Sequence, residues 1–164
     1  MTQILTDRLV LKKPGPDDKP LLVSQIGDWE VSRWLSRVPY PYTLSDADEW
    51  LDIISSHEMD FNVFKDGLLI GGAGLTQDED DYHELGYWLG RKYWGHGFAT
   101  EACRALLDHA RLAFNCSKIK ASYLQGNAGS ANVLKKLGFE AIGEGEIYCV
   151  PRKETVACIK LELA

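Results

Sequence analysis

Apolar residues that alternate with polar ones, or that form short runs between turn residues, predict seven strands in this chain. The turn-like sequence KDG lies between two of these runs, and the strands around it are expected to pair antiparallel in a meander. Alternation is clearest in the last strand, at Ile159, Leu161 and Leu163. In chain order the predicted strands are RLVLKK (8–13), DFNVF, LLIGGAGL, YHELGYWLG, KIKASYL, Phe139–Cys149 and Glu154–Leu163.

Four other segments carry apolar residues three and four positions apart, which is the spacing of an amphipathic helix. One is expected around 19–27, one after Ser45, one from Ala99, and one in NAGSANVLKKLG, which ends at Gly138. The segment between the first two, rich in proline and aromatic residues, is expected to be a loop. This order of elements predicts an α+β fold, with a mixed sheet and helices on both faces. The apolar stripe of the third helix consists of Ala99, Ala102, Cys103, Leu106, Ala110 and Ala113.

Length and composition narrow the class of protein. A chain of 164 residues, 45% hydrophobic and 26% charged, fits a single globular domain over residues 1–164. No apolar run approaches the about 20 residues that cross a bilayer, and the first residues do not resemble a signal peptide, so a cytoplasmic protein is expected. The formal net charge of -6 argues against binding to nucleic acid or to an anionic membrane. A cationic or amine-bearing partner suits this charge better.

The cysteines give no sign of a metal or redox site. Cys103, Cys116, Cys149 and Cys158 include no CxxC pair and have no neighbouring histidine cluster. We therefore expect no bound metal, and reduced, mostly buried thiols. Cys149 and Cys158 are expected in partner strands of the last hairpin, so a disulfide between them stays open at this point.

The sequence RKYWGHGFATEA places two glycines just before a predicted helix. Glycine-rich backbone at a helix N-terminus gathers unpaired N–H groups and the positive end of the helix dipole, which suits an anion. A P-loop would need Lys-Ser/Thr after the last glycine, where Phe98 and Ala99 stand. A dinucleotide fingerprint would need a third glycine and a later acidic residue, which are missing. On these residues alone, anion binding and a plain tight turn both stay open.

Three motifs together resemble a known family. ELGYWLG, the glycine-rich stretch and NAGSANVLKKLGF follow one another within residues 84–139. In this order and spacing the chain resembles the GNAT superfamily of N-acetyltransferases, and most closely its ribosomal-protein amino-terminal (RimJ/RimL-like) subgroup. The resemblance implies the GNAT fold, with a mostly antiparallel sheet of about seven strands. It also implies transfer of an acetyl group from acetyl-CoA to a primary amine, of either a protein N-terminus or a small molecule.

The resemblance also implies which residues bind the coenzyme. Main-chain amides of the glycine loop would wrap the pyrophosphate, although Lys92 stands where the family usually has Gln or Arg. The strand residues Trp88, Leu89 and Gly90 would pair through main chain with the pantetheine arm. Asn127 would bond the pantetheine through its side chain, and its alternative role is a helix N-cap. The loop residues are Gly95, His96, Gly97, Phe98, Ala99 and Thr100.

Catalytic groups are harder to assign. Many members of the family use a helix tyrosine as the acid for the leaving thiolate, and Leu134 stands at that position. In the RimJ/RimL-like subgroup a serine often follows the asparagine, so Ser130 would be the hydroxyl nearest the sulfur. Glu84 is the candidate base because it shares a strand face with Trp88, and its alternative is a plain exposed carboxylate. His83 lies on the opposite face and is expected to play no part.

The acceptor is expected to bind near the acidic Asp28 and Glu30, among some of the aromatic residues Trp29, Trp34, Tyr40 and Tyr42. Such a group of side chains suits an amine. An alternative function is a GNAT-shaped module that binds CoA without turnover, which the missing tyrosine motivates. Family members often form dimers, so a homodimer is compatible, although no segment identifies an interface.

Overall fold

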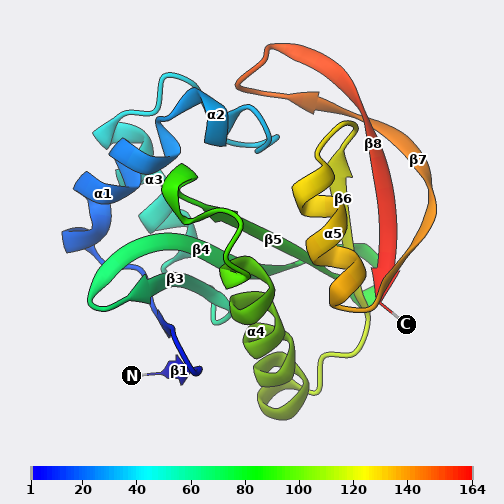
Figure 1. The fold of residues 1–164 in the computed structure, drawn as a ribbon, viewed down its shortest axis with the longest axis horizontal. Helices are drawn as coiled ribbons and strands as arrows, with labels where there is room; N and C mark the ends of the chain where they lie inside the picture. The colour runs from blue at the N-terminus through cyan, green and yellow to red at the C-terminus, as the bar shows by residue number, and fades with distance from the viewer. Residues whose placement is uncertain (1, 164) are drawn as a thin grey trace.

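The computed structural model describes residues 2–163, which form one eight-stranded sheet (Figure 1). The strand order is β1-β2-β3-β4-β5-β6-β8-β7, and every neighbouring pair is antiparallel except β5 and β6. The predicted α+β fold is confirmed, with one strand more than expected. The strands are β1 (Gln3–Leu5), β2 (Val10–Lys12), β3 (Asp60–Lys65), β4 (Leu68–Gln77), β5 (His83–Leu89), β6 (Ile119–Leu124), β7 (Phe139–Cys149) and β8 (Glu154–Leu163).

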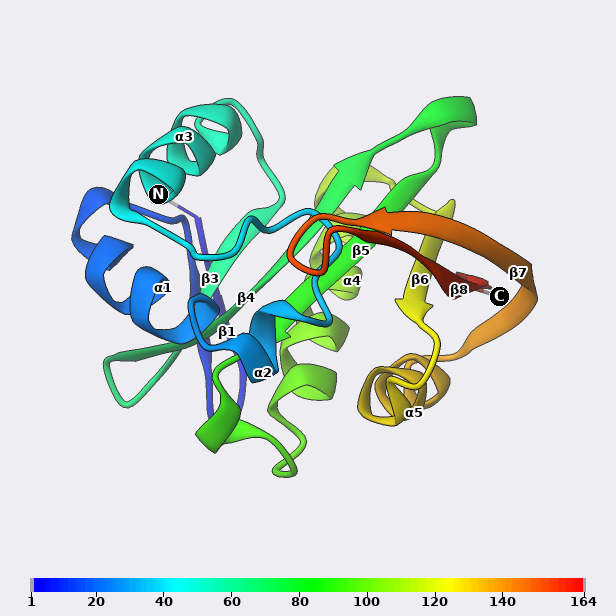
Figure 2. The same cartoon turned by 90° about the horizontal axis from the view of Figure 1, so that it is seen from above.

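Helices cover both faces of the sheet, as predicted. Helices α4 and α5 lie side by side on one face, and the N-terminal helices lie on the other (Figures 1 and 2). Three short 3-10 turns complete the described chain. The helices are α1 (Lys19–Ile26), α2 (Trp29–Ser32), α3 (Leu44–Ile54), α4 (Phe98–Phe114) and α5 (Ala128–Lys136).

The segment expected as a loop between the first two helices contains the short helix α2. Asp28 starts it, because its side chain accepts a hydrogen bond from the N–H of Glu30 at 3.1 Å. Helix α3 begins at Leu44 instead of after Ser45. Thr43 is its N-cap and exchanges hydrogen bonds with Asp46, which forms a capping box.

Alternation along the central strands divides the interior into two cores. Phe61, Val63 and Ile70 point toward α4 and α5 and pack in the larger core. Phe64 and Leu69 point the other way, against α1 and α3. This division follows from the period of two in a strand, and it shows that both faces of the central strands are buried.

Strand β5 is the element that opens the sheet. It pairs with β4 along its whole length, from His83 to Leu89. It pairs with β6 only at His83 and Glu84, and the two parallel strands diverge beyond that point. The predicted opening of this strand away from its neighbour is therefore confirmed.

The four cysteines are free and buried. Cys149 pairs in register with Glu154, and Cys158 with Gly145, so the two cysteines are not opposite each other in the hairpin. This register explains why the disulfide left open by the sequence is absent. Among residues 2–163, no helix has both the length and the hydropathy that a bilayer crossing requires.

Candidate active site

A cavity of about 970 Å³ runs through the opening between β5 and β6. One end is lined by the glycine loop and by the start of α5, residues 126–130. The other end lies on the opposite face of the sheet, against residues 34–39 and α3. Its volume lies in the range of small-molecule sites, and its shape gives two ligands access to one point from opposite faces.

The main chain of β5 offers hydrogen bonds to this cavity at alternate residues. In an antiparallel ladder, successive residues direct their N–H and C=O groups to opposite edges. Gly90 donates to the carbonyl of Ile70 at 2.8 Å, so Trp88, two residues earlier, also directs its main chain toward β4. Leu89 and Tyr87 therefore face the opening with their main-chain groups. The Leu89 carbonyl accepts from the Trp94 indole at 2.9 Å, which leaves the Leu89 N–H directed into the opening.

This geometry corrects part of the predicted pantetheine contact. Gly90 does not line the cavity, its N–H is used by Ile70, and its carbonyl accepts from the Tyr93 N–H at 2.9 Å. Trp88 lines the cavity with its side chain, while its main chain belongs to the β4 ladder. Of the three predicted strand residues, Leu89 alone keeps a main-chain donor toward the opening.

The glycine loop has the backbone that an anion site requires. Gly95 and Gly97 both have φ of +79°, in the left-handed region that glycine adopts without strain. Gly97 is the N-cap of α4 and provides no side chain to cap it, so the N–H groups of the first turn lack an intrahelical partner. The predicted loop residues Gly95, Gly97, Phe98, Ala99 and Thr100 line the cavity, whereas His96 does not.

Ser130 and Tyr87 meet inside the cavity. The Ser130 hydroxyl lies 2.6 Å from the Tyr87 hydroxyl, although the residues are 43 positions apart. Burial raises the pKa of Tyr87, and the hydrogen bond with Ser130 only partly opposes this, so the phenol stays protonated at neutral pH. The sequence interpretation missed Tyr87. The strand alternation could have indicated the position of Tyr87, because it places Tyr87 with Leu85 and Leu89 on the face toward α4 and α5.

Asn127 performs the capping role that was its alternative interpretation. Its side-chain oxygen accepts a hydrogen bond from the Ser130 N–H at 3.2 Å. Asn127 also lines the cavity, and its side-chain NH₂ group stays available as a donor. Capping and ligand contact are therefore compatible in this residue.

Glu84 lies at the other end of the cavity, on the strand face that it shares with Trp88. A side-chain oxygen of Glu84 is 3.5 Å from the Arg37 guanidinium, and its side chain is 30% exposed. His83 does not line the cavity. Asp46, Glu49 and Asp60 line it together with Glu84, so this end is acidic.

The aromatic residues expected to bind the acceptor are only partly in place. Trp34 lines the cavity. Trp29 and Tyr40 do not, because they pack against each other with ring centroids 4.8 Å apart. Asp28 is also unavailable, because it forms two hydrogen bonds with the Arg91 guanidinium, at 2.7 and 2.9 Å, and these lower its pKa. Tyr42, which was also expected there, lines the cavity, and so does Trp50.

The sequence interpretation also missed the contribution of α3. Asp46, Glu49, Trp50 and Ile53 are three or four positions apart and all line the cavity. Their spacing was visible in the sequence. Only the packing of α3 over the sheet shows that this stripe faces a cavity.

Comparison with known proteins gives consistent matches. Residues 8–140 match the family described as acetyltransferase (GNAT) domain. The ribosomal protein uS5-alanine N-acetyltransferase of Escherichia coli (strain K12) is 34% identical over an alignment of 163 positions that covers 89% of this chain and 82% of that protein.

Two solved structures have the same fold at lower sequence identity. The GNAT-family acetyltransferase from Bacillus anthracis superposes with a TM-score of 0.86 at 19% identity, covering 99% of this chain and 98% of that one. Mycobacterium smegmatis RimJ, in complex with CoA-disulfide, gives a TM-score of 0.76 at 19% identity, covering 94% and 81%.

Proposed function

The chain belongs to the GNAT family of acetyltransferases, and we propose that it transfers an acetyl group from acetyl-CoA to a primary amine. The observation that carries the proposal is the cavity through the opening between β5 and β6. Unpartnered amides of the α4 N-terminus lie at one end, and carboxylates lie at the other. A thioester held from the first end would meet an amine that enters from the second.

The coenzyme end fits a diphosphate because of its backbone. The N–H groups of residues 97–100 would hold the phosphate oxygens, with the α4 dipole adding to the attraction. The Asn127 side chain would bond the pantetheine arm and orient it along the edge of β5, so that the thioester carbonyl at its end meets the Leu89 N–H. When bound, acetyl-CoA supplies the acetyl group as a reactive thioester.

Glu84 at the acceptor end of the cavity and Ser130 at the coenzyme end would carry the proton transfers. Glu84 accepts the proton of the attacking amine through water, because it lies on the face where the amine enters. The Leu89 N–H stabilises the negative charge that develops on the carbonyl oxygen. Ser130 passes its hydroxyl proton to the leaving sulfur from the opposite face and takes the proton of the Tyr87 phenol in its place, and Tyr87 then regains a proton from solvent. The two hydroxyls would together replace the helix tyrosine that many family members use as the acid for the thiolate.

We further propose that residues 1–164 act as one acetyltransferase domain in the cytoplasm, on the amine of a protein N-terminus or of a small molecule. The acidic end of the cavity supports an acceptor that is cationic before it loses its proton. The name of the E. coli relative, a ribosomal protein uS5-alanine N-acetyltransferase, motivates the protein N-terminus as the first acceptor to test.

The test separates an enzyme from a CoA-binding module. Calorimetry with CoA is expected to show binding, and acetyl-CoA is expected to release free thiol when a peptide with an alanine N-terminus or a small amine is added. A peptide with an already acetylated N-terminus is the matched control and should release none. Binding without thiol release across the panel would favour the module that lacks turnover, and absence of binding would contradict both.

Glu84→Gln is expected to lower kcat/KM about tenfold. This is less than the usual effect of losing a general base, because water reaches the partly exposed side chain of Glu84 and can accept the amine proton in its place. The substitution preserves the size of the side chain and removes the proton acceptor. Steady-state kinetics against amine concentration checks the prediction. Glu146→Gln, on the exposed side of β7, is the control. A Glu84→Gln variant as active as the wild type would leave Glu84 as a structural carboxylate.

A further inference from the structure

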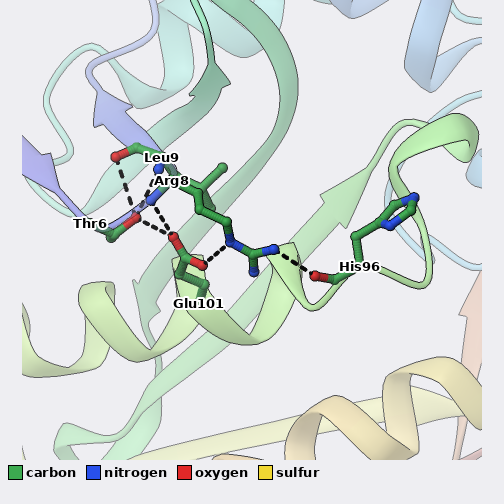
Figure 3. A network of polar contacts seen from close by, with 5 residues as sticks. All are labelled: Thr6, Arg8, Leu9, His96 and Glu101. Atoms are coloured by element: carbon green, nitrogen blue, oxygen red, sulfur yellow. Dashed lines mark hydrogen bonds and ion pairs between the residues drawn. The ribbon is translucent and has the colours of Figure 1, made fainter.

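The loop between β1 and β2 contacts the glycine loop through Arg8 (Figure 3). The Arg8 Nε donates to a carboxylate oxygen of Glu101 at 2.7 Å, and its Nη1 donates to the carbonyl of His96 at 3.0 Å. Glu101 is in the first turn of α4, and His96 is in the glycine loop. One guanidinium thus bridges the helix to the loop that precedes it.

Glu101 is a fixed and charged partner for Arg8. Its carboxylate also accepts hydrogen bonds from the Thr6 hydroxyl and from the Arg8 main-chain N–H. Burial raises the pKa of Glu101, but the hydrogen bonds from Thr6 and Arg8 outweigh burial and hold the pKa below its usual range. Glu101 is therefore ionised at neutral pH and keeps the Arg8 side chain in place.

Arg8 also lies against Gly97 and Phe98, the two residues that follow His96. Its guanidinium carbon is 4.5 Å from the centre of the Phe98 ring. Its Nη2 is 3.5 Å from the place where a Cβ on Gly97 would lie. These contacts place the guanidinium behind the loop, since Gly97 lines the cavity whereas Arg8 and His96 do not.

The bond to the His96 carbonyl determines where the next amide points. In a trans peptide, the C=O and N–H groups point in opposite directions. Because Arg8 holds the His96 carbonyl on its own side, the Gly97 N–H points away from Arg8. Without this bond, rotation of the peptide plane would meet little resistance, because glycine adopts many backbone conformations at low cost.

We propose that Arg8 is a positioning residue: it holds the His96–Gly97 peptide so that the Gly97 N–H points toward the coenzyme diphosphate. Arg8 does not itself contact the diphosphate. This inference rests on the proposed function, because it assigns the diphosphate to the glycine loop. It links coenzyme affinity to a loop that lies 88 positions from His96 in the sequence.

Arg8→Met tests the inference, because it keeps an unbranched side chain and removes both hydrogen bonds. We expect the Kd for CoA to rise about tenfold, which corresponds to the loss of one charge-assisted hydrogen bond. Kinetics with S-acetylpantetheine, which has no diphosphate, should be unchanged. Arg8→Lys should weaken CoA binding by less, because one ammonium replaces a guanidinium that bridges two acceptors. Arg111→Met, which removes a pair with Asp108 farther along α4, is the control.

The outcomes separate this inference from the proposed function. Unchanged CoA affinity in folded Arg8→Met would overturn the inference while leaving the acetyltransferase proposal intact. An equal loss with S-acetylpantetheine would also overturn it, because it would indicate a general structural role. If Arg8→Met does not fold, Arg8→Lys decides by the same comparison. Wild-type protein that fails to bind CoA would overturn the proposed function and this inference together.

Discussion

Gly97→Val is expected to weaken CoA binding by about 100-fold or more, because a β-branched side chain is strained at this φ and would crowd the Arg8 guanidinium, whose Nη2 is 3.5 Å from the position of the new Cβ. Gly97 has φ of +79° and is the N-cap of α4. Valine would move the loop toward negative φ and turn its amides away from the cavity.

Calorimetry with CoA measures the effect, and thermal unfolding verifies that the variant is folded. Gly143→Val is the matched control, because Gly143 lies in β7 without positive φ, and a Cβ added there would meet open space. It should bind CoA as the wild type does. A folded Gly97→Val variant with wild-type affinity would place the diphosphate elsewhere and remove the main support for the proposed site.

Ser130→Ala is expected to lower kcat about 100-fold while the Kd for CoA changes less than about twofold. Ser130 is the hydroxyl that we assign to the leaving sulfur, and its main-chain N–H, which Asn127 caps, stays in place in the variant. The loss therefore falls on the chemical step and not on binding. Single-turnover release of thiol, with calorimetry alongside it, separates the two quantities.

Tyr87→Phe shows whether the two hydroxyls act as a unit. Tyr87 supports Ser130 through the 2.6 Å hydrogen bond, so its loss should lower kcat about tenfold, less than the loss of Ser130. The double variant should be no slower than Ser130→Ala alone, since Tyr87 acts through Ser130. Tyr82→Phe, which removes a tyrosine hydroxyl bonded to Glu162 away from the cavity, is the control. Additive losses would mean that Tyr87 acts independently.

Most of the fold was predictable because its signals are local. The apolar runs of β3 and β4, the alternation in β8 and the apolar stripe of α4 extend over enough residues to stand out in the sequence. The strand β1 and the helix α2 were missed, because three or four residues are too few to show a period. The glycine loop could be recognised from the sequence, because its backbone adopts positive φ just before a helix and glycine is the residue that favours this conformation.

The site was predictable only where a role depends on the backbone. Residues 95 and 97–100 were identified from glycine positions and a helix start, and they line the cavity. Side chains were placed less well. Trp29 and Tyr40 pack against each other outside the cavity. The main-chain N–H and C=O groups of Gly90 form hydrogen bonds with Ile70 and Tyr93. Whether a side chain faces a cavity depends on the rotation of its helix or the course of its loop, which no local pattern encodes.

The sequence by itself determined most of the strands and helices and their order along the chain, the glycine backbone before α4 and the family resemblance, because each depends on residues close together in the chain. Tertiary structure alone decided that Tyr87 meets Ser130, that Arg8 meets Glu101 and His96, and that α3 adds carboxylates to the cavity. These contacts join residues 43 to 93 positions apart. They depend on strand register and on how helices pack across the sheet, and both are properties of the assembled fold.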